Sequence, residues 1–426
     1  MCFFSKKPLV LWCCLLVSAA SSFLFADSSP LSRGPYLQLG NTNEMTIMLC
    51  TLSNSACTIE YGMSTNYSHT LISGNQSLHR VVLSNLLQNS RYYYRVSCGA
   101  AMQAGSFRTY PAGSEPVVFA AVGDTRNNFS NDAYYIRERN RSLAEWQALY
   151  QPYFLLNNGD LVFAADPLTN IAWQETFDDF SPLLRQSPLY IATGNHELNL
   201  YTGEICPGYF DYFSFPTNGP TPERIYSFDC GQIHVVVGEV HNAVTVSNES
   251  YYCPGSPQFT WITNDLARTS KPWKIVMTHC PVYSSGETYG TWGYKNQQST
   301  NLVKYYVPEF KKYDVNLHIA GHEHLYERCQ QADTTYLTVS SWDDSYAYRF
   351  TNFPYSISSS PFGGAVFAVT NELMYVTTAV AGSNEINFVD YFVITNQVIP
   401  EPGIALTALG VVCIYAIMRR RSVPVF

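Results

Sequence analysis

The stretch VVFAAVGD, from Val117 to Asp124, is an apolar run of strand length that ends in a glycine and a carboxylate. Four later runs have the same pattern: each ends in small or polar residues that are followed by Asp, Asn or His. They read YFLLNNGD (153–160), LYIATGNHE (189–197), KIVMTHCP (274–281) and VNLHIAGHEH (315–324). The carboxyl ends of parallel strands line one edge of an α/β sheet, where ligands bind. The five runs therefore predict strands that gather these polar side chains in one place.

Longer amphipathic segments separate the apolar runs. DAYYIRERNRSLAEWQALY (132–150) and NLVKYYVPEFKKY (301–313) are two of them. Strands that alternate with helices are typical of an α/β core. Two hairpins are also predicted, one around Cys230-Gly231 and one within GGAVFAVTNELMYVTTAVAG (363–382).

The region 33–110 has a different pattern. It consists of short, alternating segments rich in β-branched and aromatic residues, with turn residues between them. This pattern predicts a small β-sandwich. SNLLQNSRYYYRV (84–96) is similar to the tyrosine-corner region of fibronectin type III-like domains. A Pro/Gly-containing segment, YPAGSEP (110–116), is the predicted linker to the α/β part.

The first 26 residues have the order of a secretory signal peptide. Lys6 and Lys7 precede a long apolar run that ends in small residues near Ala26. The alternative is an uncleaved membrane anchor. Both interpretations place the rest of the chain beyond a membrane.

The segment 399–421 predicts a C-terminal membrane anchor. A Pro-Glu-Pro triplet (400–402) precedes the uncharged stretch 403–418, and three arginines (419–421) follow. This order resembles the PEP-CTERM sorting signal of Gram-negative bacteria. The resemblance implies an exosortase-type processing enzyme as a partner. It also implies a location at the cell envelope or cell surface, anchored in the membrane before processing.

Composition narrows the class of protein. The chain has 426 residues, of which 46% are hydrophobic and 14% charged, with a net charge of −8. No basic patch is evident, so nucleic acid binding is not expected. Eight of the 12 cysteines lie outside the two terminal segments, and an even number in an exported protein permits disulfides. Cys206 and Cys253 are expected among the bonded ones.

The polar residues that end the five runs are of the types that bind metal ions. Two carboxylates, one amide oxygen and three imidazoles are predicted to converge: Asp124, Asp160, Asn195, His279, His322 and His324. This set is too large for one tetrahedral zinc, but it suits two neighbouring metals. The mixture of oxygen and nitrogen favours Fe, Zn or Mn, as divalent or trivalent ions.

Taken in order, the motifs GDTR (123–126), GDLVF (159–163), GNHE (194–197), THCP (278–281) and GHEHLYER (321–328) resemble those of calcineurin-like metallophosphoesterases. The similarity is to the purple acid phosphatase-like branch and covers roughly 33–396. It implies a β-domain at 33–110 and a metallophosphoesterase domain at 116–396. The implied fold is an α/β sandwich of two mixed sheets flanked by helices. A small all-β immunoglobulin- or fibronectin-like sandwich precedes it.

The resemblance also implies roles for individual residues. Asp160 would be the carboxylate that bridges two metals. Asp124 and His324 would complete one metal site. Asn195, His279 and His322 would complete the other. His196, the catalytic residue implied, would contact a phosphoryl oxygen and protonate the leaving group.

Two positions depart from the family pattern. Arg126 stands where many metallophosphoesterases have a histidine ligand, and Phe163 stands where purple acid phosphatases have an iron-binding tyrosine. We therefore predict no purple chromophore and a first metal that is held loosely or completed by water. Arg126 is a candidate substrate-binding residue, since its guanidinium could hold phosphate with two hydrogen bonds. A salt bridge beside the site is the alternative.

The resulting functional hypothesis is an exported, dinuclear metal-dependent phosphoesterase. Hydroxide formed at the metals would attack phosphorus, with phosphomonoesters preferred over diesters, as in an acid phosphatase. The substrate would be a small-molecule or polymer phosphate ester. The competing hypothesis is a surface-anchored binding or matrix protein whose phosphatase-like domain is degenerate and weakly active. His318 is expected in the core, and His241 could approach the site.

Overall fold

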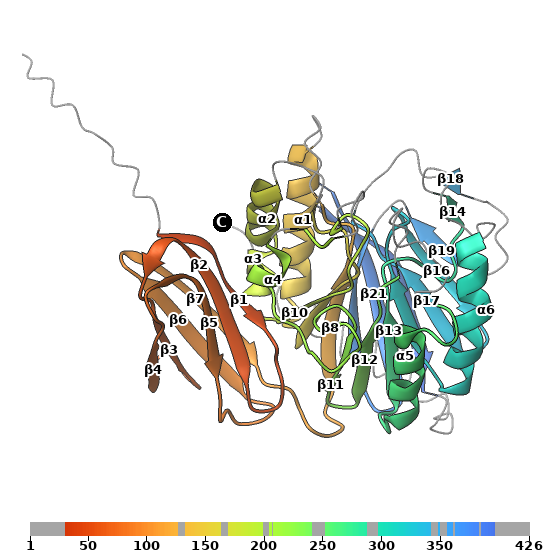
Figure 1. Ribbon diagram of the computed structural model, residues 1–426, viewed down its shortest axis with the longest axis horizontal. Coiled ribbons are helices and arrows are strands. Elements are labelled where there is room, and N and C mark those ends of the chain that lie inside the picture. The colour runs from red at the N-terminus through yellow and green to blue at the C-terminus, as the bar shows by residue number, and fades with distance from the viewer. Residues whose placement is uncertain are drawn as a thin grey trace, which may run out of the picture.

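The computed structural model describes residues 30–126, 133–162, 169–198, 204–206, 208–240, 252–287, 297–341, 348–349, 356–360, 363–382 and 385–396. Within these residues, no helix has the length and apolar character needed to cross a membrane. The predicted signal peptide, the PEP-CTERM segment, Phe163 and His241 all lie outside them. Figure 1 shows a β-domain beside a larger α/β domain.

The N-terminal part contains two antiparallel sheets (Figure 1). The first has the strand order β1 (Leu31–Gln38), β2 (Met45–Ser55), β5 (Gln76–Leu83). The second has the order β4 (His69–Ile72), β3 (Thr58–Gly62), β6 (Arg91–Cys98), β7 (Ala101–Arg108). Inward-facing residues of both sheets, such as Ile47, Ile59 and Phe107, form one buried cluster. Alternation along the strands produces this core, since successive side chains of a strand point to opposite faces.

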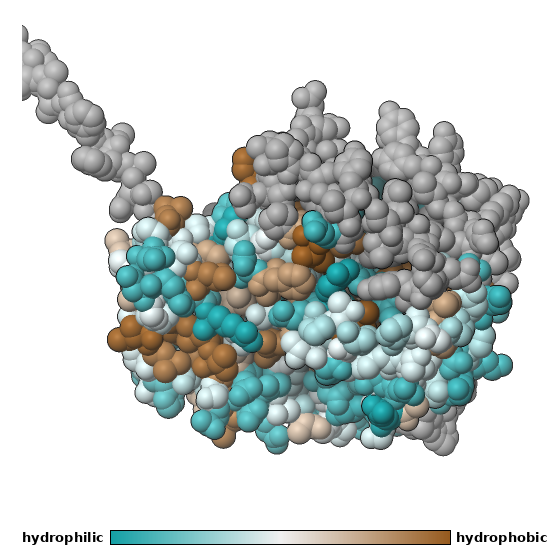
Figure 2. All heavy atoms as spheres, in the orientation of Figure 1, coloured by the Kyte–Doolittle hydropathy of each residue, from teal (hydrophilic) through white to brown (hydrophobic). Residues whose placement is uncertain are grey.

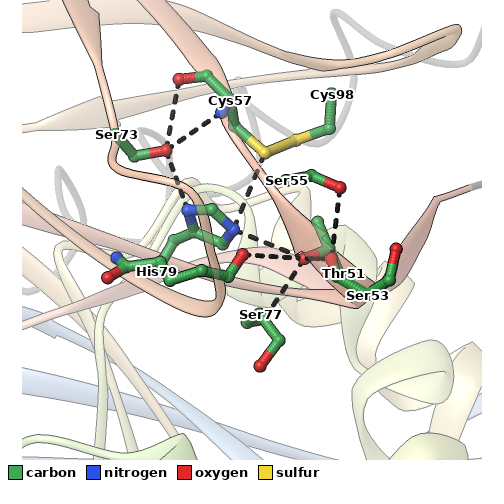
Figure 3. Close-up of a disulfide and its surroundings, with 9 residues drawn as sticks. Thr51, Ser53, Ser55, Cys57, Ser73, Ser77, His79 and Cys98 are labelled. Atoms are coloured by element: carbon green, nitrogen blue, oxygen red, sulfur yellow. Dashed lines mark hydrogen bonds between the residues drawn. A yellow bond between two sulfur atoms is a disulfide. The ribbon is translucent and has the colours of Figure 1, made fainter.

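A disulfide joins Cys57 to Cys98 in the second sheet (Figure 3). The buried imidazole of His79 lies beside it, with Nε2 3.8 Å from Cys57 Sγ and Nδ1 2.8 Å from the Ser73 hydroxyl. The prediction for Cys206 and Cys253 is wrong, because both are free thiols. Their distance along the chain gave no information on their distance in space.

The α/β part contains two mixed sheets that pack face to face (Figure 1). Sheet one has the order β10 (Leu189–Ile191), β9 (Phe154–Asn157), β8 (Val117–Val122), β20 (Gly364–Val369), β21 (Leu373–Gly382), β22 (Glu385–Thr395). Sheet two has the order β11 (Tyr226–Cys230), β12 (Ile233–Val237), β13 (Trp273–Met277), β15 (Leu317–Ala320), β17 (Thr334–Thr338), β16 (Tyr326–Gln331), β19 (Ser356–Ser360). A two-stranded pair, β14 (Gly286–Glu287) and β18 (Tyr348–Arg349), lies apart.

Parallel strands occupy the part of each sheet that carries the polar strand ends. Strands β8, β9 and β10 run parallel in sheet one, and β12, β13, β15 and β17 run parallel in sheet two. The predicted hairpins are confirmed as the antiparallel pairs β11–β12 and β20–β21. Between the sheets, the stacked rings of Phe119, Phe154 and Phe367 lie in one hydrophobic core with residues of sheet two.

Helices flank the two sheets. They are α1 (Ala133–Ala148), α2 (Thr169–Asp179), α3 (Ser181–Leu184), α4 (Tyr209–Tyr212), α5 (Pro257–Arg268) and α6 (Gln297–Lys312). In Figure 1, α1 and α2 lie on the side of sheet one, and α5 and α6 lie on the side of sheet two. Leu302, Tyr306 and Phe310 of α6 pack with residues of sheet two in a second core. Two mixed sheets flanked by helices, preceded by antiparallel β-sheets, confirm the predicted fold class.

The β-domain shares a core with the α/β part. The Tyr36 ring of β1 is 1% exposed and lies 4.5 Å, between ring centroids, from Phe177 of α2. Gln38, also on β1, donates from Nε2 to the Leu189 carbonyl of β10 at 3.1 Å. The buried contact of two aromatic rings and the buried hydrogen bond of the Gln38 side chain therefore fix the β-domain against the edge of sheet one.

Candidate metal centre

The five polar strand ends meet, but they come from two sheets. Asp124, Asp160 and Asn195 follow β8, β9 and β10 of sheet one. His279 and His322 follow β13 and β15 of sheet two. The site therefore lies where the carboxyl ends of two parallel strand groups face each other.

Three electron-pair donors converge on the sheet-two side of the site. Asn195 Oδ1 lies 3.0 Å from His279 Nε2 and 3.0 Å from His322 Nδ1. The two ring nitrogens are 3.3 Å apart. All three side chains are buried, with Asn195 the most exposed at 8%.

The tautomer of His279 explains why this arrangement suits a cation. His279 Nδ1 lies 2.8 Å from the Asn158 carbonyl oxygen, which can only accept, so Nδ1 carries the proton. In a neutral ring, Nε2 is then an acceptor. It faces the Asn195 amide oxygen at 3.0 Å and Asp160 Oδ1 at 3.4 Å. Three acceptors this close repel one another unless a positive charge lies among them.

The carboxylates extend the site toward sheet one. The nearest ligand atoms of Asp124, Asp160 and His279 all lie within 4.8 Å of one another. His324 Nε2 lies 3.9 Å from Asp124 Oδ1. The structure thus brings together all six residues predicted as metal ligands. Their oxygen and nitrogen donors fit ions such as Zn, Mn or Fe.

Three of the candidate metal ligands lie in turns whose backbone has an unusual conformation, and this conformation orients their side chains. Asp124, Asp160 and His322 have φ of +49°, +59° and +68°, in the left-handed region that non-glycine residues seldom adopt. The main-chain N–H of His322 donates to both Asp124 carboxylate oxygens at 3.1 Å. Strained backbone of this kind clusters at functional sites, where the surrounding structure holds it in place.

Glu197 holds the turn that carries Asp160. Its Oε2 accepts hydrogen bonds from the N–H groups of Asp160 and Gly194, each at 2.8 Å, and its Oε1 accepts from Leu161 N–H at 2.6 Å. Gly194 leaves room for this arrangement, because a Cβ there would overlap Asp160 Oδ1. Although the sequence motif contained Glu197, its pattern did not assign it this role.

Burial and close charges shift the pKa values of the carboxylates in opposite directions. Burial, reinforced by the nearby Asp160, raises the pKa of Asp124 well above its ordinary value. Burial also acts to raise the pKa of Asp160, but His279, His196 and Arg126 hold it below the ordinary value. Asp160 is therefore the charged centre of the cluster in the metal-free chain.

Arg126 and His196 both contact Asp160. Arg126 Nη1 donates to Asp160 Oδ2 at 2.6 Å, which is the salt bridge considered from the sequence as the alternative to phosphate binding. The main-chain N–H of His196 donates to Asp160 Oδ1 at 2.9 Å, and its Nε2 lies 3.7 Å from Oδ2. Burial lowers the pKa of His196 to about 3, so the ring is neutral at pH 7.

Other polar residues near the motifs have structural positions. His318 lies inside β15, 1% exposed, with Nε2 3.0 Å from the Thr278 hydroxyl. Glu327 Oε2 accepts a hydrogen bond from Ser285 N–H at 2.7 Å. Cys280 is 0% exposed and lies in the second core with Val276 and Tyr336. These contacts account for the three residues without a catalytic role.

Comparison with known proteins gives a consistent picture. Residues 117–326 match the calcineurin-like phosphoesterase family. A probable purple acid phosphatase 20 of Arabidopsis thaliana is 27% identical over 279 residues, which cover 63% of this chain and 59% of that protein. Purple acid phosphatase 1 of Ipomoea batatas is 27% identical over 263 residues, covering 60% of this chain and 52% of that protein. The chain thus spans little more than half the length of these relatives.

Solved structures share the fold. The purple acid phosphatase PPD1 of yellow lupin (Lupinus luteus) superposes with a TM-score of 0.67 at 19% identity, covering 85% of this chain and 74% of that chain. The structure of PhoD gives a TM-score of 0.66 at 13% identity, covering 87% and 91%. At these identities the similarity establishes the architecture only.

Proposed function

We propose that this chain, whose residues 117–326 match the calcineurin-like phosphoesterase family and which has purple acid phosphatase homologues, is a dinuclear metal-dependent hydrolase of phosphate esters. One observation supports this most directly. His279 Nε2, which is an acceptor in the neutral ring, faces two oxygen acceptors, Asn195 Oδ1 and Asp160 Oδ1, in a buried cluster. A cation is the species that makes such a cluster favourable.

The chain's own residues divide the work as follows. Asp124 and His324 would hold one ion, Asn195, His279 and His322 would hold the other, and the Asp160 carboxylate would be available to both. Bound cations supply Lewis acidity, which lowers the pKa of water and offsets charge on phosphoryl oxygens. His196 would donate to the leaving oxygen. Because its ring is neutral at pH 7, protonation depends on the negative charge of bound phosphate, which raises a nearby imidazole pKa.

Arg126 would exchange partners during the cycle. In the metal-free chain its guanidinium neutralises Asp160. With ions held beside Asp160, the Arg126 guanidinium would no longer be needed to neutralise this carboxylate, and repulsion between like charges would favour its moving away. Arg126 would then be available to hold substrate phosphate with two hydrogen bonds.

The finer parts of the proposal concern substrate and location. We infer a preference for phosphomonoesters over diesters, on small-molecule or polymeric substrates. Export to the cell envelope, anchoring at 399–421 and processing by an exosortase-type enzyme rest on the terminal sequences.

The second candidate function is surface binding by a protein whose phosphatase-like domain has weakened. Figure 2 shows hydrophobic residues gathered over the β-domain on the visible face. Exposed apolar side chains of this domain include Leu52, Ile72, Leu87 and Met102, each at least 59% exposed. Apolar patches of this kind mark interaction surfaces. About two metals per chain in the purified protein supports the enzyme, whereas none contradicts it.

The decisive experiment compares hydrolysis of aryl phosphate monoesters and diesters by wild type and by Asp160→Ala. We expect Asp160→Ala to abolish hydrolysis of both. Asp179→Ala is a matched control, because Asp179 is a buried carboxylate paired with Arg137 on α1. Equal activity of wild type and Asp160→Ala would refute the proposed site. Equal loss in both variants would show damage to the fold.

A further inference from the structure

Asn158, the residue before the Gly-Asp pair that ends the β9 run, contacts both sheets at the metal centre. Its side chain is 0% exposed. The amide nitrogen Nδ2 donates to the carbonyl of Ala320 and to the carbonyl of Val339, each at 2.8 Å. Ala320 ends β15, two residues before His322, and Val339 follows β17. One side chain from sheet one therefore binds two strand ends of sheet two.

The main chain of Asn158 reaches two further parts of the site. Its N–H donates to the Val122 carbonyl at the end of β8, at 3.0 Å. Its carbonyl accepts from His279 Nδ1 at 2.8 Å, the contact that fixes the His279 tautomer. The main chain of Asn158 thus contacts His279 directly and contacts the end of β8 two residues before Asp124.

The orientation of the amide is set by chemistry. Two carbonyl oxygens can only accept, so the NH2 group must face them. The amide oxygen then points toward Gly123 and Gly321, where it has no hydrogen-bond partner among the described residues. A Cβ at either glycine would overlap this oxygen. Both glycines therefore make room for the amide, although a buried acceptor left unpaired costs about 1–3 kcal/mol.

We propose that Asn158 is a positioning residue that holds the metal ligands of sheet two at the correct distance from those of sheet one, because each proposed metal site takes ligands from both sheets. It does so by fixing the ends of β15 and β17 in sheet two against β9 in sheet one. This inference rests on the proposed dinuclear function. Asn158 is not one of the six proposed metal ligands, and its side chain would act through the residues whose main chain it holds.

The geometry explains why such a clamp matters. Asp124, Asp160 and Asn195 come from sheet one, whereas His279, His322 and His324 come from sheet two. Sheets packed through side chains alone can slide by small amounts. Hydrogen bonds of fixed length between the strand ends would limit this sliding at the point where the ligands meet. Removing partners that orient metal ligands commonly weakens metal affinity by about 10–100-fold.

Gln147 provides a matched control. It is also 0% exposed, and its Nε2 donates to two strand carbonyls, those of Ala121 at 3.0 Å and Ala365 at 3.2 Å. Its Oε1 likewise has no hydrogen-bond partner in the described part of the chain. Ala121 and Ala365 belong to β8 and β20 of the same sheet, so this amide joins helix α1 to sheet one and spans no gap between sheets.

The test uses the full chain, stripped of metal with a chelator and titrated with Mn²⁺ alone. Calorimetry gives the affinity of each Mn²⁺. Electron paramagnetic resonance distinguishes a spin-coupled pair from isolated ions. For Asn158→Leu we expect the second Mn²⁺ to bind about 10–100-fold more weakly, with isolated-ion signals in place of the coupled one. Gln147→Leu, which removes two amide hydrogen bonds to main-chain carbonyls as Asn158→Leu does, should keep both the affinity and the coupled signal.

Asn158→Asp keeps the shape of the side chain, removes both donors and serves if the leucine variant does not fold. An added carboxylate would by itself favour cation binding. Weaker binding of the second ion in this variant therefore supports the clamp. Wild-type affinity and coupling in both Asn158 variants would overturn the inference alone. Absence of Mn²⁺ binding by wild type would instead overturn the proposed function, and the inference with it.

Discussion

Substitution of Gly159 by alanine tests how tightly the backbone at the proposed centre is packed. Gly159 precedes Asp160 and has φ of +106°, which side chains with a Cβ seldom adopt. A Cβ there would lie 2.7 Å from His279 Nδ1, 2.7 Å from the Ala192 carbonyl oxygen and 2.8 Å from Gly194 N. Real Cβ atoms do not approach other heavy atoms so closely, so something must move.

The expected loss of stability has two sources. A side chain in this backbone conformation costs about 1–3 kcal/mol, and overpacking a closed site costs about 1–3 kcal/mol. Gly159→Ala should therefore lower the free energy of unfolding by roughly 2–6 kcal/mol. Gly255 separates the two sources, because its φ is +91° and its Cβ would meet nothing within 4 Å. Gly255→Ala should lose only the first part, about 1–3 kcal/mol.

Urea unfolding of the metal-free proteins, followed by circular dichroism, measures both losses. Mn²⁺ titration of the same samples measures the effect on the site. We expect Gly159→Ala alone to weaken Mn²⁺ binding, because its Cβ presses on His279. If Gly159→Ala loses no more stability than Gly255→Ala, the close packing inferred around Gly159 is refuted. Unchanged Mn²⁺ affinity would refute its link to the metal centre.

Two further predictions concern regions away from the centre. Although burial acts to lower it, hydrogen bonds to Asp229 and Asp265 raise the pKa of His234 to about 9. The resulting stabilisation, at most about 3 kcal/mol, is complete below about pH 6.5 and is lost as the pH rises through about 9. Urea midpoints of His234→Gln should lack this pH dependence, and a wild-type-like profile would contradict it. Replacing Cys57 and Cys98 by serine opens a loop of 41 residues and should lower unfolding stability by about 4 kcal/mol. Unchanged thermal midpoints would contradict this estimate.

The sequence was sufficient to predict the fold class and the meeting of the polar strand ends. Runs such as VVFAAVGD carry both the strand pattern and the polar residue that follows it. The sequence of such a run is enough to predict a strand followed by a turn, because both depend mainly on neighbouring residues. What periodicity did not reveal is that β8 and β13 belong to different sheets. Sheet membership depends on pairing between distant segments.

The supporting residues were harder to predict for the same reason. Asn158 and Glu197 act through hydrogen bonds to main-chain groups far away in sequence or across a turn. Main-chain groups are present at every position, so the sequence does not mark which of them a side chain will contact. The Cys57–Cys98 pairing was open for a similar reason, since eight cysteines outside the termini allow many connectivities.

The contact of Tyr36 with Phe177 has a consequence for how the molecule comes apart. If the chain were cut within 110–116 and the two parts were separated, Phe177 and the Leu189 carbonyl of β10 would be exposed to water. Neither side of the cut would then be a complete folding unit. The intact chain should accordingly show one calorimetric transition on heating, in which both parts unfold together. The β-domain covers aromatic residues of the α/β part and so contributes to that part's stability.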